Sequence, residues 1–129
     1  MINIASAIQS LNKDNNNSHE FVIYGKPTTE TEYQQNVKYI SGADDNGSAI
    51  FSDTQPYTWQ QVSIKQAELQ ADYDAKQYQR NRAEKYPSIQ DQLDKLFHDI
   101  NNGTLDNTGK FFTAINIVKT NNPKPSEDD

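Results

Sequence analysis

Three side chains on one expected helical face are the strongest candidates for chemistry in this sequence. His98 follows Asp94 by four residues and Asp91 lies one turn further back, so a helix would align two carboxylates with an imidazole. A metal site usually needs three or more convergent ligands, and the other histidine, His19, lies in a distant polar segment. We therefore interpret His98 as an exposed side chain near the C-terminal end of its helix, where a positive charge is favourable.

A second candidate is the acidic run around Asp44 and Asp45, which suggests a calcium loop. The spacing does not fit, because an EF-hand that starts at Asp44 would need its glycine where Ala49 stands. A hairpin turn at Asn46-Gly47 explains the run better. The sequence also lacks a Gly-x-Ser-x-Gly motif, a phosphate-binding loop and a dinucleotide fingerprint, so we expect no enzyme, no cofactor and no metal site.

Charge and cysteine content exclude further classes. The 129-residue chain has 12 basic and 18 acidic residues, a net charge of -6 that argues against binding to nucleic acid or anionic membranes. Zero cysteines exclude disulfides and thiolate chemistry. No stretch approaches the length of a membrane span or a secretion signal, so we expect synthesis in a cytoplasm and no membrane insertion.

The apolar content is low. Only 33% of the residues are hydrophobic. Globular domains usually contain about 45–50% apolar residues, in a count that includes Gly and leaves out Tyr. This deficit favours an elongated shape, a disordered share, or burial completed by partner subunits, with a homo-oligomer among the possibilities.

The fold class that we predict is α+β, with a small α+β head at residues 1–57. Ile4, Ala7, Ile8 and Leu11 have helical spacing and predict a short N-terminal helix. EFVIYG, VKYIS and SAIFS predict a three-stranded antiparallel sheet with that helix over one face. The polar segment after Pro27 can begin with a helical turn that is capped by Thr29 or Thr31.

A long helix is expected at residues 58–86. TWQQ has the form of a capping box, and no glycine or proline follows before Pro87. After Tyr73 the apolar positions thin out, so we expect the later turns to project into solvent or to pack on another chain. Pro87 disfavours helical geometry at Tyr86 and should end or kink the helix there.

Residues 87–122 predict a C-terminal αα-hairpin. Ser88 can cap its first helix, which places Ile89, Leu93, Leu96, Phe97 and Ile100 on one face, and Asn101-Asn102-Gly103 ends it. A final helix over about residues 108–120 carries further apolar residues, so the two apolar faces can close on each other. The tail, residues 123–129, is acidic and predicted to be disordered.

Aromatic residues spread over the helical half are the candidates for an adhesive surface. We place Leu93, Phe97, Phe111 and Ile115 in the chain's own core as the simplest interpretation. For Tyr78 and Tyr86, an interface and the core both stay open. The interface candidates as a set are Trp59, Tyr73, Tyr78, Tyr86 and Phe97.

Most of the chain also resembles a family of small virion or tail-associated proteins of marine tailed bacteriophages, especially cyanophages. The resembling stretches are FVIYGKPTTETEYQQNVKYISG, QPYTWQQVSIKQAELQA and the segment from Tyr73 to Pro125, of which YQRNRAEKYPSIQDQLDKLFHDI is the most specific part. The resemblance implies a small α+β head followed by helices, and a phage structural or assembly protein that is made in the host cytoplasm. It transfers no catalytic residues.

Three functions follow as hypotheses. The first is a non-enzymatic structural protein of the virion at the tail, fibre or baseplate, which packs on itself or on other phage structural proteins. The second is a tail or tail-fibre assembly chaperone that is absent from the finished particle. The third is a phage protein that binds a host factor.

Overall fold

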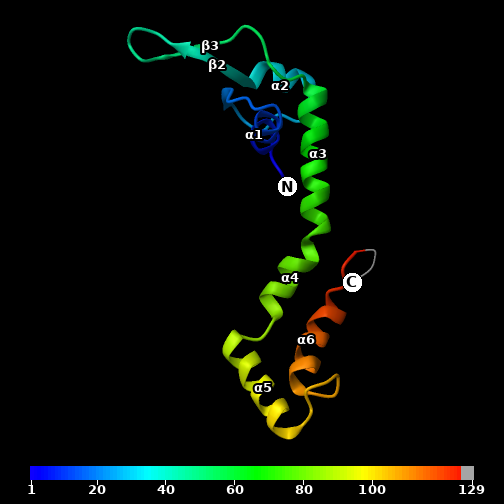
Figure 1. Cartoon of the computed structure of the whole chain (residues 1–129). Helices are drawn as coiled ribbons and strands as arrows, with labels where there is room; N and C mark the ends of the chain where they lie inside the picture. The colour runs from blue at the N-terminus through cyan, green and yellow to red at the C-terminus, as the bar shows by residue number, and fades with distance from the viewer. Residues whose placement is uncertain (126–129) are drawn as a thin grey trace. The chain divides into compact units, whose positions relative to one another are not determined.

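The computed structural model describes residues 1–125, and the chain divides into two compact units, which we call unit 1 (residues 1–72) and unit 2 (residues from 73 onward). Figure 1 shows the elements of both units. The predicted α+β class is confirmed, with a short N-terminal helix, a three-stranded antiparallel sheet and then further helices. The predicted acidic tail lies outside the described residues from position 126 onward.

The sheet of unit 1 contains β1 (Glu20–Ile23), β2 (Val37–Ala43) and β3 (Ala49–Phe51), in the order β1-β2-β3. Both pairs are antiparallel, and the register shifts between Ile40 and Gly42. In the hairpin loop only Gly47 adopts positive φ (81°), while the Asp44 carboxylate accepts hydrogen bonds from the N–H groups of Asn46 and Ser48. The turn predicted at Asn46-Gly47 is present, but one left-handed residue is enough for it.

Side-chain caps begin the two short helices of unit 1. Asn3 caps α1 (Ile4–Asp14) by accepting from the N–H of Ser6, and Thr29 caps α2 (Glu30–Asn36) by accepting from the N–H of Glu32. The Glu32 carboxylate accepts in turn from the Thr28 N–H at 2.7 Å. Of the two caps proposed for this turn, Thr29 is therefore the one used.

The core of unit 1 lies between α1, the sheet and the first turns of α3 (Trp59–Ala75) (Figure 1). The apolar face predicted for α1 is the face that it buries, and α3 contributes Val62. The predicted capping box opens α3, since Gln61 accepts from the Thr58 N–H and Thr58 from the Gln61 N–H. The buried core residues are Ile4, Ala7, Ile8, Leu11, Tyr33, Val37, Tyr39, Tyr57 and Val62.

Three tyrosines make this small core partly polar. The Tyr33 hydroxyl donates to the Tyr57 carbonyl oxygen at 2.6 Å, so its 2.9 Å contact with the Tyr39 hydroxyl must be donated by Tyr39. The Tyr57 hydroxyl donates to Asn12 Oδ1 at 2.8 Å. Each hydroxyl is thus hydrogen-bonded, as burial of a polar group requires.

The predicted long helix is present but is interrupted at Lys76, which separates α3 from α4 (Gln77–Lys85). Lys76 leaves helical geometry with φ -94° and ψ 7°, and the Arg80 guanidinium donates to the Tyr73 carbonyl oxygen at 2.8 Å. Neither glycine nor proline marks this position. The residue types in this part of the sequence therefore did not predict the interruption.

Unit 2 ends in the predicted αα-hairpin, in which α5 (Ile89–Asn102) and α6 (Lys110–Asn121) lie side by side (Figure 1). Tyr86 is extended before Pro87, Ser88 caps α5 through the Asp91 N–H, and Gly103 ends α5 in left-handed geometry, all as predicted. The boundary between the two units falls within α3, between Asp72 and Tyr73. The first turns of α3 belong to the core of unit 1.

Candidate protein-binding surface

An apolar stripe on α5 contains four of the exposed large apolar side chains of unit 2. Ile89 is 70% exposed, Leu93 59%, Phe97 65% and Ile100 60%, and all four lie on the predicted apolar face of the helix. We call these four residues the α5 stripe. The prediction that Leu93 and Phe97 belong to the chain's own core is therefore wrong, whereas Phe97 as an interface residue stays a prediction.

The α5 stripe stays exposed because α5 contacts α6 through a different side of the helix, the one that carries Asp99. Asp99, only 2% exposed, lies beside the stripe on the helix and directs its carboxylate at the N-terminus of α6. Oδ1 accepts from the Lys110 N–H at 3.0 Å and Oδ2 from the Phe111 N–H at 2.8 Å. The Phe111 hydrogen bond, followed by that of Lys110, keeps the pKa of Asp99 below its ordinary value.

Gly109 makes this arrangement possible. Its backbone is extended, not left-handed, so the need for glycine is one of space. A Cβ at this position would clash with the Thr104 carbonyl oxygen and would lie 2.6 Å from Asp99 Oδ2. The absence of a side chain thus lets the carboxylate reach the first N–H groups of α6.

The opposite end of α6 is held by Arg82 of α4, which is 9% exposed. Its Nε donates to the Asn122 carbonyl oxygen at 2.9 Å and its Nη2 to the Lys119 carbonyl oxygen at 3.5 Å. Asn122 is itself buried and donates through Nδ2 to the Val118 carbonyl oxygen. A carboxylate therefore holds the positive end of the α6 dipole, and a guanidinium holds the negative end.

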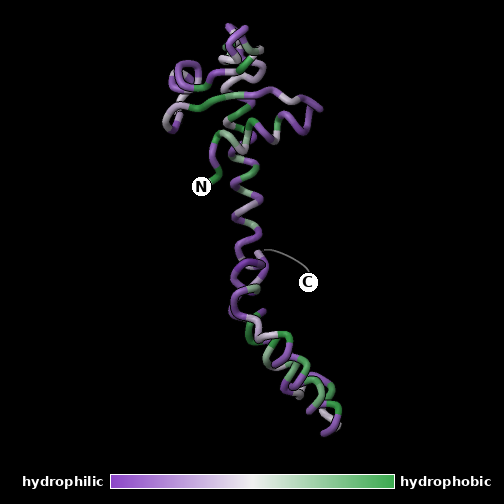
Figure 2. Tube along the Cα trace, turned by 90° about the vertical axis from the view of Figure 1, so that its left-hand side faces the viewer, coloured by the Kyte–Doolittle hydropathy of each residue, from purple (hydrophilic) through white to green (hydrophobic). Residues whose placement is uncertain are grey.

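These contacts correct the expectation for the turns after Tyr73. We expected these turns to project into solvent or to pack on another chain, but α4 packs on α6 of the same chain through Arg82, while more than half of its residues stay exposed. Among the apolar residues of α6, Val118 is buried, and Phe111 and Ile115 are half-buried, as expected of core residues. Phe112 and Ile117 stay exposed. Figure 2 shows apolar positions recurring along α5 and α6, whereas α4 is almost wholly hydrophilic.

The other predicted interface residues lie in varied surroundings. Trp59 packs against the core of unit 1, with its ring 5.7 Å from that of Tyr33. Tyr73 is exposed under the Arg80 guanidinium, 3.7 Å from its ring centroid. Tyr78 is half-buried, with Arg82 5.0 Å over its ring, and Tyr86 is half-buried at the end of α4. Of the five candidates, Phe97 alone lies on the α5 stripe.

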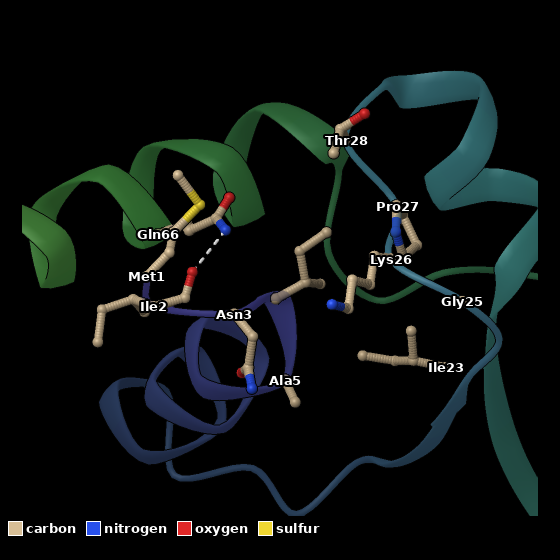
Figure 3. Close-up of a pocket in the computed structure, with 11 residues that line it drawn as sticks. Met1, Ile2, Asn3, Ala5, Ile23, Gly25, Lys26, Pro27, Thr28 and Gln66 are labelled. Atoms are coloured by element: carbon tan, nitrogen blue, oxygen red, sulfur yellow. Dashed lines mark hydrogen bonds between the residues drawn. The ribbon is translucent and has the colours of Figure 1, made fainter.

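An apolar hollow of about 640 Å³ lies in unit 1 beside the start of α1. Figure 3 shows Ile23 and Lys26 extending toward α1 there, and the Gln66 amide donating to the Ile2 carbonyl oxygen at 2.7 Å. The hollow is open and brings together no group of titratable side chains, so it offers no arrangement for catalysis.

The chemical candidates remain isolated. His98 Nε2 lies 3.6 Å from Asp94 Oδ2, and both side chains are mostly exposed. Within residues 1–125, no group of three or more His, Cys, Asp or Glu side chains is placed to hold a metal ion. Over the same residues, every helix is too short or too polar to cross a bilayer.

The sequence interpretation missed Arg82, Asp99 and Asn122, which hold the helices of unit 2 together. One signal for Asp99 was available: α6 begins after Gly109, which has no side chain with which to cap it. A helix without its own cap must find an acceptor elsewhere in the chain. Nothing comparable in the sequence marks Arg82 among the neighbouring polar residues.

Comparison of this chain with protein-family models, with curated proteins and with solved structures gives no match in any of the three.

Proposed function

We propose that this protein is a non-enzymatic structural component of a bacteriophage virion, in the tail, fibre or baseplate, and that it acts through protein–protein contacts made by unit 2. The observation that carries the proposal of a contact protein is the α5 stripe, which unit 2 leaves exposed. The assignment to a phage tail rests on the sequence resemblance described above.

The energetics of the α5 stripe support a binding role. Full burial of a Leu, Ile or Phe side chain contributes about 1.5–3 kcal/mol, so four largely exposed ones leave several kcal/mol unused in a single chain. A contiguous apolar patch that is surrounded by polar residues is typical of an interaction site. The polar flanks of α5, with Gln90, Asp94 and His98, supply such a rim.

An assembly chaperone is the alternative function. The same stripe would then cover an apolar surface of a tail or fibre protein before assembly. A protein that binds a host factor is a further alternative, which the acidic net charge of -6 permits.

Analysis of purified phage particles separates these functions. We expect the chain to be present in virions at a fixed ratio to the other tail proteins, as measured by quantitative mass spectrometry. Presence in infected cells but absence from particles would contradict the structural role. Co-purification with an unassembled tail protein would then support the chaperone, and co-purification with a host protein would support the third function.

A further inference from the structure

The apolar face of α5 has a symmetric spacing. Ile89, Leu93, Leu96 and Ile100 follow one another at intervals of four, three and four residues, so the order Ile-Leu-Leu-Ile is the same in both directions. Intervals of four and three are those of a coiled-coil seam. Leu96 is half-buried, and the other three side chains are exposed.

We propose that the α5 stripe binds the α5 stripe of a second copy of this chain, with the two helices antiparallel about a two-fold axis. Such an interface uses the same patch on both copies and must be complementary to itself. Antiparallel alignment puts Ile89 opposite the second copy's Ile100, and Leu93 opposite its Leu96. Phe97 lies beside this seam, on the side away from Asp99 and α6, which we call the open flank.

Charge is compatible with this pairing. The position that corresponds to Phe97 one heptad earlier is Gln90, so the open flank of the seam carries no charge. The charged residues Asp91, Asp94 and Lys95 lie further around the helix. Antiparallel alignment also sets the positive N-terminal end of each α5 next to the negative C-terminal end of the other.

The available area suits a small specific dimer. Eleven residues separate Ile89 from Ile100, which gives a seam about 16 Å long. At these exposures each large side chain presents on the order of 100 Å², so the eight stripe residues of two copies supply about two-thirds of the roughly 1,200 Å² that small specific interfaces bury. Leu96 and the polar rim can supply the remainder.

A second copy also fits the composition. The chain is only 33% hydrophobic and leaves the α5 stripe exposed, and a second copy supplies an apolar surface of the same size and shape. The inference rests on the proposed function only in that both assign protein contacts to the α5 stripe.

The first test is the mass of the full chain in solution, measured by light scattering at low and high concentration. We expect twice the single-chain mass at high concentration, and we expect Leu93→Glu to raise the dissociation constant about tenfold or more, because it places a charge in the seam. Ile117→Glu is the matched control, since Ile117 is 54% exposed on α6 and lies outside the stripe. A single-chain mass throughout, or a dimer that Leu93→Glu leaves intact, would overturn the proposal.

The second test measures the alignment and does not depend on Leu93→Glu folding. Since the chain has no cysteine, Ile89→Cys and Ile100→Cys variants each carry a single thiol. Mixed and then oxidised, they should form a disulfide between the two different variants in preference to one between identical chains. Cross-links between identical chains alone would indicate a parallel pair and overturn the proposal.

The two proposals fail separately. A single-chain mass combined with a fixed stoichiometry in virions would overturn the antiparallel dimer and leave the structural role intact, with another protein on the stripe. A dimer combined with absence from virions would overturn the structural role and leave the antiparallel dimer intact.

Discussion

The two units of this protein differ in what they bury. Unit 1 buries a cluster of apolar residues around Ile8, Tyr33 and Val62, although some other apolar side chains, such as Tyr24, stay exposed. Unit 2 buries Asp99 and Arg82 as well as Val118, and exposes the α5 stripe. Packing therefore holds unit 1 together, whereas hydrogen bonds to the ends of one helix contribute much of the order in unit 2. The difference leaves an apolar surface of four side chains exposed on unit 2.

The largest expected effect is a loss of stability in unit 1. Ile8 is fully buried, so Ile8→Ala should reduce the free energy of unfolding by about 2–5 kcal/mol. Fluorescence of Trp59, the single tryptophan, reports this unfolding because its ring packs on the core. Leu93→Ala is the control, since this exposed residue of unit 2 should change the stability of the single chain by less than about 0.5 kcal/mol. Equal effects of the two variants would remove the contrast between the units.

A smaller effect should follow from Tyr33→Phe. Loss of this hydroxyl leaves the Tyr57 carbonyl oxygen and the Tyr39 hydroxyl without their partner, at a cost of about 1–3 kcal/mol. Urea unfolding measures the change. Tyr24→Phe is the control, because Tyr24 is exposed and should have almost no effect.

Alkaline titration extends this test. Burial raises the pKa of Tyr39 above its ordinary value of about 10, so the folded state holds this proton more tightly than the unfolded state does. The resulting stabilisation is complete below about pH 10 and is lost as the pH rises through the folded pKa. Unit 1 should therefore unfold in strong alkali, and constant stability above pH 10 would contradict the buried network.

Gly109→Ala tests how closely the end of α6 fits against α5. The added methyl group would contact Asp99 Oδ2 and the Thr104 carbonyl oxygen, so we expect a loss of about 1–3 kcal/mol. In thermal unfolding followed by circular dichroism, the variant should lose the helix signal of unit 2 at a lower temperature than the unchanged chain does. Gly42→Ala is the control, because a Cβ there would have nothing within 4 Å. If the two substitutions were equivalent, the close fit at Gly109 would be wrong.

The mildest perturbation is acid. Hydrogen bonds from α6 lower the pKa of Asp99 below its unfolded value of about 3.9, so its stabilising contribution is complete above that pH and is lost as the pH falls through the folded pKa. We expect α6 to loosen in this window, and Asp99→Asn to loosen it at neutral pH and to weaken the acid response. NMR spectra of the Lys110 and Phe111 amides measure the change.

Asp106 is the control for this titration. Hydrogen bonds from Thr108 also lower its pKa, but the carboxylate serves the loop rather than the end of α6. Asp106→Asn should leave both amide signals in place at neutral pH. An acid response that followed Asp106 rather than Asp99 would contradict the role assigned to Asp99.

Local signals in the sequence predicted most of the elements but not how unit 2 packs. The caps at Thr58 and Ser88, the strands and the α1 face depend on neighbouring residues, so spacing alone revealed them. The exposure of Leu93 and Phe97 was missed because helical periodicity gives the apolar face of a helix but not what covers it. Asp99 and Arg82 act across 11 to 40 residues, a distance over which no local pattern extends.

The contacts of Asp99 and Arg82 with the two ends of α6 have a consequence for how this helix forms during synthesis. At 12 residues α6 is at the limit of what forms alone in water, so a peptide of residues 103–125 should show little helix by circular dichroism. A strongly helical peptide would contradict this expectation. Arg82 and Asp99 both precede α6 in the chain, and they leave the ribosome before it does. α6 therefore emerges when the side chains that contact both its ends are already present.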